Sequence, residues 1–195
     1  MSRKKNAKKT LSILTNEGVL HAVLREMDLT FNAPEPSEKA KAAGIGMVTV
    51  AFSVADDENG DAGGTTPTAF VANIFSHDEA VLRVFSSLYR VPNGVDEADV
   101  LRIVNRLNQD HLLDAKIEFV EGNGMIRLRA VYRSDAETLP ARPVATFLDE
   151  VFEASLHVRL VIMVALKSKA KYPESFEEGL TKLREKTSWE DGAFL

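Results

Sequence analysis

Residues 95–133 read VDEADVLRIVNRLNQDHLLDAKIEFVEGNGMIRLRAVYR, and this stretch decides the fold. It follows the turn residues Asn93 and Gly94, and its Asp96 has the side chain of a helix N-cap. Apolar residues then recur at three- and four-residue spacing, which predicts a helix with one buried stripe. The stripe comprises Val100, Ile103, Val104, Leu107 and His111.

The second half of this stretch predicts a β-hairpin. Apolar and charged side chains alternate on both sides of Asn-Gly at residues 123–124, a pair typical of a type I′ turn. With a two-residue turn, Phe119 lies opposite Leu128. The same register places Glu118 opposite Arg129, so we expect one buried side and one solvent-facing side.

A long helix is predicted after the hairpin. Pro140 and Pro143 suit the approach to a helix and its first turn, where a missing N–H costs little. Its apolar face is formed by Val144, Phe147, Leu148, Val151, Phe152 and Leu156. From Val158 to Leu166 only Arg159 is polar, which predicts a helix buried on all sides, with a buried strand as the alternative. Charged residues and His157 interrupt the apolar stretch of roughly twenty residues that a membrane span needs.

The apolar segment at residues 158–166 also predicts a homodimer. A helix at the edge of a two-layer domain buries one stripe against its own sheet, so its other apolar side chains need a further cover. We expect a second copy of the chain to provide it, through an interface of Val158, Leu160, Val161, Ile162, Val164 and Leu166. In the competing arrangement, the C-terminal residues fold back over the same surface and leave a monomer. These residues are Phe176, Leu180, Leu183 and Trp189.

Composition limits the classes to which this chain can belong. Its 195 residues fit one domain, and 45% hydrophobic residues are enough for a core. The formal net charge of −5 argues against general affinity for nucleic acid, whose binders usually carry a basic face. The lack of cysteine excludes disulfides and thiolate chemistry, and agrees with a reducing compartment. No apolar signal core is found near the N-terminus, so we expect a cytoplasmic location.

One domain is expected between two tails. Residues 1–10 are rich in lysine and arginine with almost no large apolar residue, which is typical of a flexible, solvated tail. The alternative is a basic arm that touches RNA, an anionic lipid or an acidic partner. Residues 11–168 are expected to form the domain. Residues 169–195 are expected to be a polar tail with a short helix.

The first half of the domain supplies the rest of the sheet. Thr15 or Asn16 is expected to cap a helix that ends near Met27. Three runs with strand composition follow, at residues 47–54, 68–75 and 81–89. With the hairpin they predict an α+β fold, an antiparallel sheet of about five strands with helices packed on one face. Residues 28–31 are a candidate for a further short strand, and residues 32–46 are expected to be irregular.

No constellation in the sequence predicts catalysis, a cofactor or a bound metal. Residues 57–61 carry oxygen donors at alternate positions, but Ala62 and Thr68 stand where an EF-hand needs glycine and glutamate. Gly-Gly-Thr-Thr at residues 63–66 lacks the lysine of a phosphate-binding loop. The histidines are isolated from one another in the sequence, at His21, His77, His111 and His157. We therefore expect a protein that is not an enzyme.

Four strings carry a family resemblance. They are VLRVFSSLYRVP at 81–92, VLRIVNRLN at 100–108, IEFVEGNGMIRLRAVY at 117–132 and FLDEVFEASL at 147–156. Together they resemble the YbjN family, whose fold looks like that of type III secretion chaperones. The resemblance covers residues 14–166, more loosely over residues 14–27. The chain departs from it by insertions at 32–46 and 57–66, by its basic tail and by an extended C-terminus.

The resemblance implies a bacterial, non-enzymatic regulator of sensory transduction or a chaperone-like adaptor, and it brings no catalytic residues. Asn105 and Asn108 are candidates for a family site, with hydrogen bonds from the helix to a loop as the alternative. We therefore expect a cytoplasmic adaptor that holds an unidentified protein partner as an added strand or as a helix in a groove. The alternative function is a small-ligand or nucleotide sensor that uses the glycine-rich loop and the sheet.

Overall fold

Six strands form one antiparallel sheet in the computed structural model, which describes residues 15–54, 68–77, 79–187 and 194. Their order across the sheet is β1-β2-β3-β4-β6-β5. The strands are β1 (Phe31–Asn32), β2 (Ile45–Val54), β3 (Thr68–His77), β4 (Val81–Arg90), β5 (Ala115–Val120) and β6 (Met125–Arg133). The predicted α+β class is confirmed, and the strand beyond the expected five is the two-residue β1.

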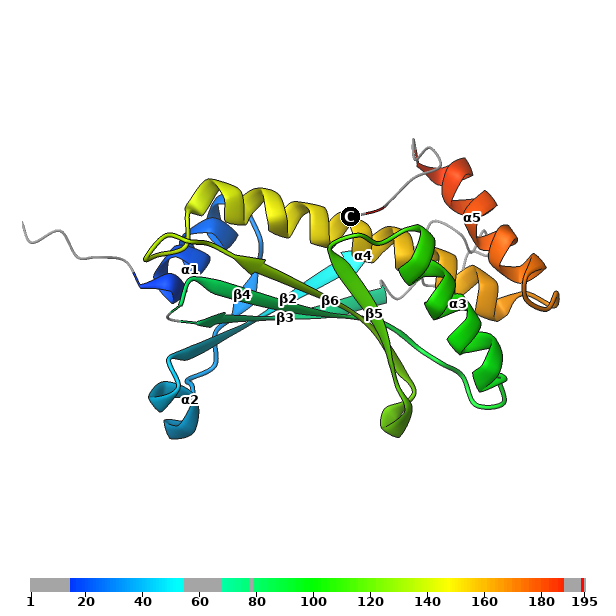
Figure 1. Ribbon diagram of the computed structural model, residues 1–195, viewed down its shortest axis with the longest axis horizontal. Helices are drawn as coiled ribbons and strands as arrows, with labels where there is room; N and C mark the ends of the chain where they lie inside the picture. The colour runs from blue at the N-terminus through cyan, green and yellow to red at the C-terminus, as the bar shows by residue number, and fades with distance from the viewer. Residues whose placement is uncertain (1–14, 55–67, 78, 188–193, 195) are drawn as a thin grey trace, which may run out of the picture.

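Three helices cover one face of this sheet (Figure 1). The helices of the described chain are α1 (Asn16–Glu26), α2 (Glu38–Ala42), α3 (Glu97–Asp110), α4 (Ala141–Lys167) and α5 (Glu174–Lys186). Helix α1 contacts β3, α3 contacts β5, and the long α4 contacts β4 and β6. Helix α5 packs on α4, and the short α2 contacts β2.

The start of α1 is tied to the segment before α4. Thr15 is the N-cap, since its side-chain oxygen accepts a hydrogen bond from the Gly18 N–H at 3.2 Å. Asn16 is buried, and its side-chain oxygen accepts a hydrogen bond from the Leu139 N–H at 2.8 Å. Because Asn16 and Leu139 are far apart in the sequence, this hydrogen bond holds the start of α1 beside the start of α4 on the same side of the sheet.

Helix α3 closes the β5 edge of the sheet. Asp96 is its N-cap, as predicted, and accepts a hydrogen bond from the Ala98 N–H at 2.9 Å. Near the other end, the Asn108 amide accepts a hydrogen bond from the Ile117 N–H at 2.7 Å and donates one to the Ile117 carbonyl at 3.0 Å. An edge strand otherwise leaves such backbone groups unpaired, so Asn108 satisfies them and blocks pairing with another strand.

The hairpin is present, but its predicted register is wrong by two residues. The strands are joined by residues 121–124, which form a 3-10 turn that ends with Gly124 at φ +65°. The Asn123 side chain accepts a hydrogen bond from the Met125 N–H at 3.0 Å, which stabilises this wider turn. The observed pairs are Ile117 with Leu128, Glu118 with Arg127, Phe119 with Ile126 and Val120 with Met125. A shift of two residues leaves every side chain on its predicted face and changes only its partner.

Helix α4 is continuous, so the strand alternative for residues 158–166 is wrong. Helix α5 packs along this part of α4, most closely at Gly179, where an added Cβ would lie 2.7 Å from the Val161 carbonyl oxygen. Three side chains of α5 belong to the hydrophobic core: Phe176, Leu180 and Leu183. Helix α5 is therefore part of the same packed unit as the sheet, whereas the sequence analysis placed residues 169–195 in a polar tail.

Candidate interaction surface

The sheet has a covered face and an open face. The covered face lies against α1, α3 and α4, and its aliphatic side chains are no more than 5% exposed. They include Val48, Val50, Ala72, Ile74, Leu82, Val84, Ile117, Ile126, Leu128 and Ala130. The open face consists of the strand residues that alternate with these and point to the side opposite the three helices. It carries Met47, Thr49, Val71, Asn73, Phe75, Val81, Arg83, Phe85, Ser87, Lys116, Glu118, Arg127, Arg129, Val131 and Arg133.

Apolar side chains on the open face form a patch over β3 and β4. The Phe75 and Phe85 rings meet edge to face, with their centroids 5.8 Å apart. The Arg127 guanidinium carbon lies 5.0 Å from the centroid of the Phe85 ring, which is a cation–π distance. Val71 and Val131 are on the same face, and all four apolar side chains are partly exposed. They offer apolar area to a partner without disturbing the core.

The open face is also basic. The strand residues named above include five basic groups and one carboxylate, Glu118, so together they carry a charge of +4, whereas the whole chain has a net charge of −5. The Glu79 and Asp135 carboxylates lie beside these strand residues and lower the charge of the region to +2. The Glu118 carboxylate lies 2.7 Å from the Arg127 guanidinium and 3.3 Å from that of Arg129. Burial raises the pKa of Glu118, but these two arginines outweigh it and hold the pKa below its usual range. Glu118 is therefore ionised at neutral pH and neutralises only one of the five cations.

The remaining cations lie near the ends of the strands. Arg83, Lys116 and Arg133 have no ion-pair partner in the described part of the chain. Arg83 and Arg133 come from neighbouring strands and line a hollow of about 300 Å³, with Glu79 and Asp135 also at its wall. Arginine binds carboxylates and phosphates through a planar fork of N–H groups. The open face thus combines exposed arginines with an apolar patch.

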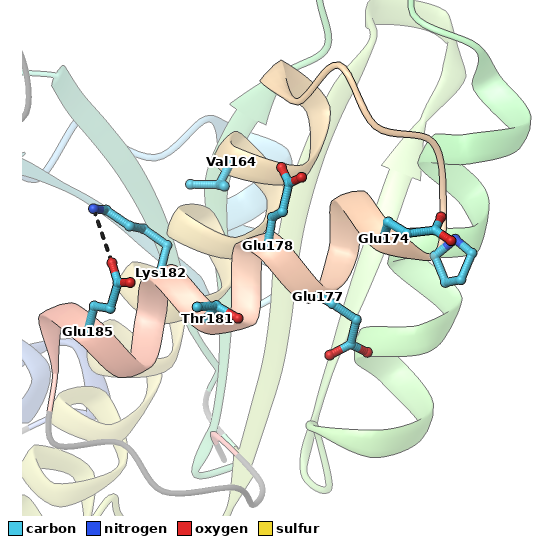
Figure 2. Close-up of a pocket in the computed structure, with 8 residues that line it drawn as sticks. Val164, Glu174, Glu177, Glu178, Thr181, Lys182 and Glu185 are labelled. Atoms are coloured by element: carbon cyan, nitrogen blue, oxygen red, sulfur yellow. Dashed lines mark hydrogen bonds and ion pairs between the residues drawn. The ribbon is translucent and has the colours of Figure 1, made fainter.

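A second concave site lies between α4 and α5 (Figure 2). This groove of about 700 Å³ is lined by Val164, Pro173, Glu174, Glu177, Glu178, Thr181, Lys182 and Glu185. Lys182 pairs with Glu185 at 3.3 Å, and Figure 2 shows Glu178 beside Val164 while Glu177 points away from it. With four carboxylates and one ammonium group, the groove is acidic and repels anionic ligands.

Half of the predicted homodimer interface is buried inside the chain. Val158, Val161 and Ile162 are 0% exposed. Leu160, Val164 and Leu166 are partly exposed. Helix α5 packs on this part of α4, which is the competing arrangement considered in the sequence analysis. The reason for expecting a homodimer, an apolar surface without a cover, therefore does not hold for the buried half, and association of two chains stays a prediction.

Two of the four histidines meet near the C-terminus. The Phe194 ring stacks on His111, with centroids 5.2 Å apart, and lies 5.8 Å from the His157 ring. The Phe194 N–H donates a hydrogen bond to the His111 carbonyl at 2.6 Å. Burial lowers the pKa of His157, and the Glu153 carboxylate, 4.0 Å away, opposes this with a smaller effect.

No group of three or more potential metal ligands occurs in residues 15–54, 68–77 and 79–187 or at residue 194.

The other candidate residues from the sequence do not come together in one site among the described residues. Asn108 is engaged by β5 as described, and Asn105 is exposed on α3. The basic residues 1–10, the oxygen donors at 57–61 and the Gly-Gly-Thr-Thr string at 63–66 lie outside the described residues, as does Trp189. In the part of the chain that the structure describes, no helix has the length and apolar character to cross a membrane.

The arginine cluster of the open face was not predicted from the sequence. The alternation of residues in the hairpin predicts that Arg127 and Arg129 face solvent. Arg83 lies on the same face only because β4 pairs with β6, although α3 and β5 come between these two strands in the sequence. The available signal was the period-two pattern, which runs through residues 81–87 as well as 127–133. No family model, curated protein or solved structure matches this chain, so its surface is interpreted from its own geometry.

Proposed function

We propose that this protein is a non-enzymatic adaptor that binds a protein partner on the open face of its sheet. The observation that supports the proposal is the presence of partly exposed phenylalanines beside several arginines, of which Arg83 and Arg133 have no ion-pair partner among the described residues. Aromatic residues and arginine are enriched at protein interfaces, where they supply much of the binding free energy. The regulatory or chaperone-like role implied by the YbjN resemblance belongs to this proposal and requires such a binding surface.

A small-ligand or nucleotide sensor is less well supported. The groove between α4 and α5 carries four glutamates, which repel the phosphates of a nucleotide. The hollow at Arg83 and Arg133 also holds two carboxylates, Glu79 and Asp135. The open face spans several neighbouring strands, and such a broad surface suits a macromolecular partner better than a small ligand.

Site-specific photocrosslinking tests the proposal. A photoreactive amino acid replaces Ser87 at the centre of the open face, and in a control protein it replaces Glu150 on the exposed side of α4. We expect a discrete protein adduct from the Ser87 position, identified by mass spectrometry, and none from the Glu150 position. Adducts of equal yield from both positions, or no adduct from Ser87, would contradict a protein-binding role for this face.

A further inference from the structure

We propose that the partner presents an acidic amphipathic segment to the open face, with carboxylates over its arginines and apolar side chains on its phenylalanines. This inference rests on the proposed function and adds the chemistry of the partner. It follows from the segregation of charge, since the strand residues of this face carry +4, or +2 with the neighbouring Glu79 and Asp135 carboxylates, on a chain of net charge −5. Complementary electrostatic potentials speed the association of two proteins and disfavour partners whose surface charge has the same sign.

Two arginines provide the seat for carboxylates. Arg83 lies opposite Val131, and Arg133 lies opposite Val81, so the two guanidinium groups come from adjacent strands at one end of the β4–β6 ladder. Neither has an ion-pair partner among the described residues, and both line the hollow of about 300 Å³. An arginine that is not already paired can take a carboxylate from a partner through two parallel hydrogen bonds.

The aromatic pair supplies the apolar half of the surface. Phe75 lies opposite Arg83, and Phe85 lies opposite Arg129, so each ring has a basic neighbour on the next strand. Apolar and basic positions therefore alternate across β3, β4 and β6. A segment in which acidic and apolar residues are interspersed matches this pattern, whereas a purely acidic segment leaves the rings in water.

A nucleic acid matches the face less well. Base stacking needs an accessible ring face, but the Arg127 guanidinium already lies over the Phe85 ring and Phe75 meets it edge to face. A continuous phosphate backbone would also pass the carboxylates of Glu79, Glu118 and Asp135. A peptide can place neutral residues at those points.

The test measures binding of defined probes by fluorescence anisotropy. The main probe is a labelled peptide of glutamate and leucine, and its analogues replace glutamate by glutamine or leucine by serine. A labelled oligouridine tests nucleic acid. We expect the glutamate–leucine peptide to bind and each analogue to bind about tenfold more weakly, with the affinity falling as salt is added.

Charge reversal locates the site. The double variant R83E/R133E is expected to bind the glutamate–leucine peptide about tenfold more weakly than the unmodified protein, because two attractive contacts become repulsive. The control R142E/K169E makes the same change in net charge at two exposed positions away from the open face, and is expected to bind like the unmodified protein. The milder R83Q/R133Q gives an intermediate loss, and circular dichroism confirms that each variant is folded.

Four results would overturn the inference. They are tighter binding of oligouridine than of the peptide, equal losses in R83E/R133E and R142E/K169E, no binding of the glutamate–leucine peptide, and self-association abolished by R83E/R133E. The last result, seen by sedimentation velocity, would make a second copy of the chain the occupant. If the Ser87 crosslink captures a protein while the peptide does not bind, the adaptor function stands and only the acidic chemistry is wrong.

Discussion

The covered and open faces of the sheet belong to the same strands but contain different residues. Along β4, Leu82 and Val84 point to the helices and are 0% exposed. Between them, Arg83 and Phe85 point to the opposite side, where Arg83 is exposed and Phe85 partly exposed. The same contrast continues in β6, where aliphatic residues alternate with arginines.

This difference separates the residues that the fold requires from those that it does not require. Burial of aliphatic surface drives folding, at about 25 cal/mol for each Å² removed from water, and the covered face provides it. The solvent side of an antiparallel sheet needs only polar residues with strand propensity. Folding therefore explains Leu82 and Val84 but not an arginine cluster beside two phenylalanines, which the proposed binding role would explain.

Removal of α5 tests the cover of α4 and should have the largest effect. A chain that ends at Lys171 loses the three core side chains Phe176, Leu180 and Leu183. Each fully buried side chain of this kind contributes about 1.5 to 3 kcal/mol. If α5 is the complete cover of this part of α4, sedimentation equilibrium will show a monomer for the full chain, and self-association or unfolding for the truncated chain. A full chain that is already a dimer, and stays one after truncation, would restore the predicted interface at residues 158–166.

A pair of neighbouring substitutions in β4 compares the two faces directly. Leu82→Ala removes a fully buried side chain from the covered face and should lower the free energy of unfolding by about 2 to 5 kcal/mol. Val81→Ala, on the open face, should lower it by about 1 kcal/mol or less. Urea denaturation measures both. Equal losses would mean that the open face is part of the core.

Gly179→Ala tests the close contact of α5 with α4. In an exposed helix this change stabilises by about 1 kcal/mol, because glycine is a poor helix former. Here the added methyl group would lie 2.7 Å from the Val161 carbonyl oxygen, so we expect a loss of about 1 to 3 kcal/mol instead. Thr181→Ala, at an exposed position of the same helix, is the matched control. A gain in stability for Gly179→Ala, measured by urea denaturation, would show that α5 is not held against α4.

The smallest effect is expected from protonation of His157. Burial lowers its pKa in the folded chain, so as the pH falls below the ordinary value of about 6.5 the unfolded chain binds more protons than the folded one. The free energy of unfolding should therefore fall as the pH drops from above 6.5 through the folded pKa. In His157→Gln this part of the pH dependence should be absent in urea titrations. A pH profile identical to that of the unmodified protein would contradict it.

Local signals predicted most of the fold. Asp96 caps α3 because a side-chain oxygen at that position satisfies a backbone N–H of the first helical turn. The alternation of apolar and charged residues in the hairpin predicted which side chains lie on each face. The register could not be predicted, because Asn-Gly occurs both in type I′ turns and in the wider turn found here. Helix α5 approaches α4 closely where Gly179 meets Val161, a contact that no local pattern encodes.

The candidate site was harder to predict for the same physical reason. Arg83 and Arg133 are far apart in the sequence and become neighbours only through the pairing of β4 with β6. Each arginine alone is an ordinary solvent-facing residue of a strand. Their proximity, like the charge contrast between the two faces, depends on strand order, which the hydrophobic periodicity of single segments does not determine.

Methyl NMR provides the most direct test of the claim that the open face binds and the covered face holds the fold. The methyl-labelled protein is titrated with the glutamate–leucine peptide. We predict shifts for Met47, Val71 and Val131 on the open face, and unchanged signals for Leu82 and Leu128 beneath the helices. Shifts confined to Val164, in the groove between α4 and α5, would place binding elsewhere and contradict the account.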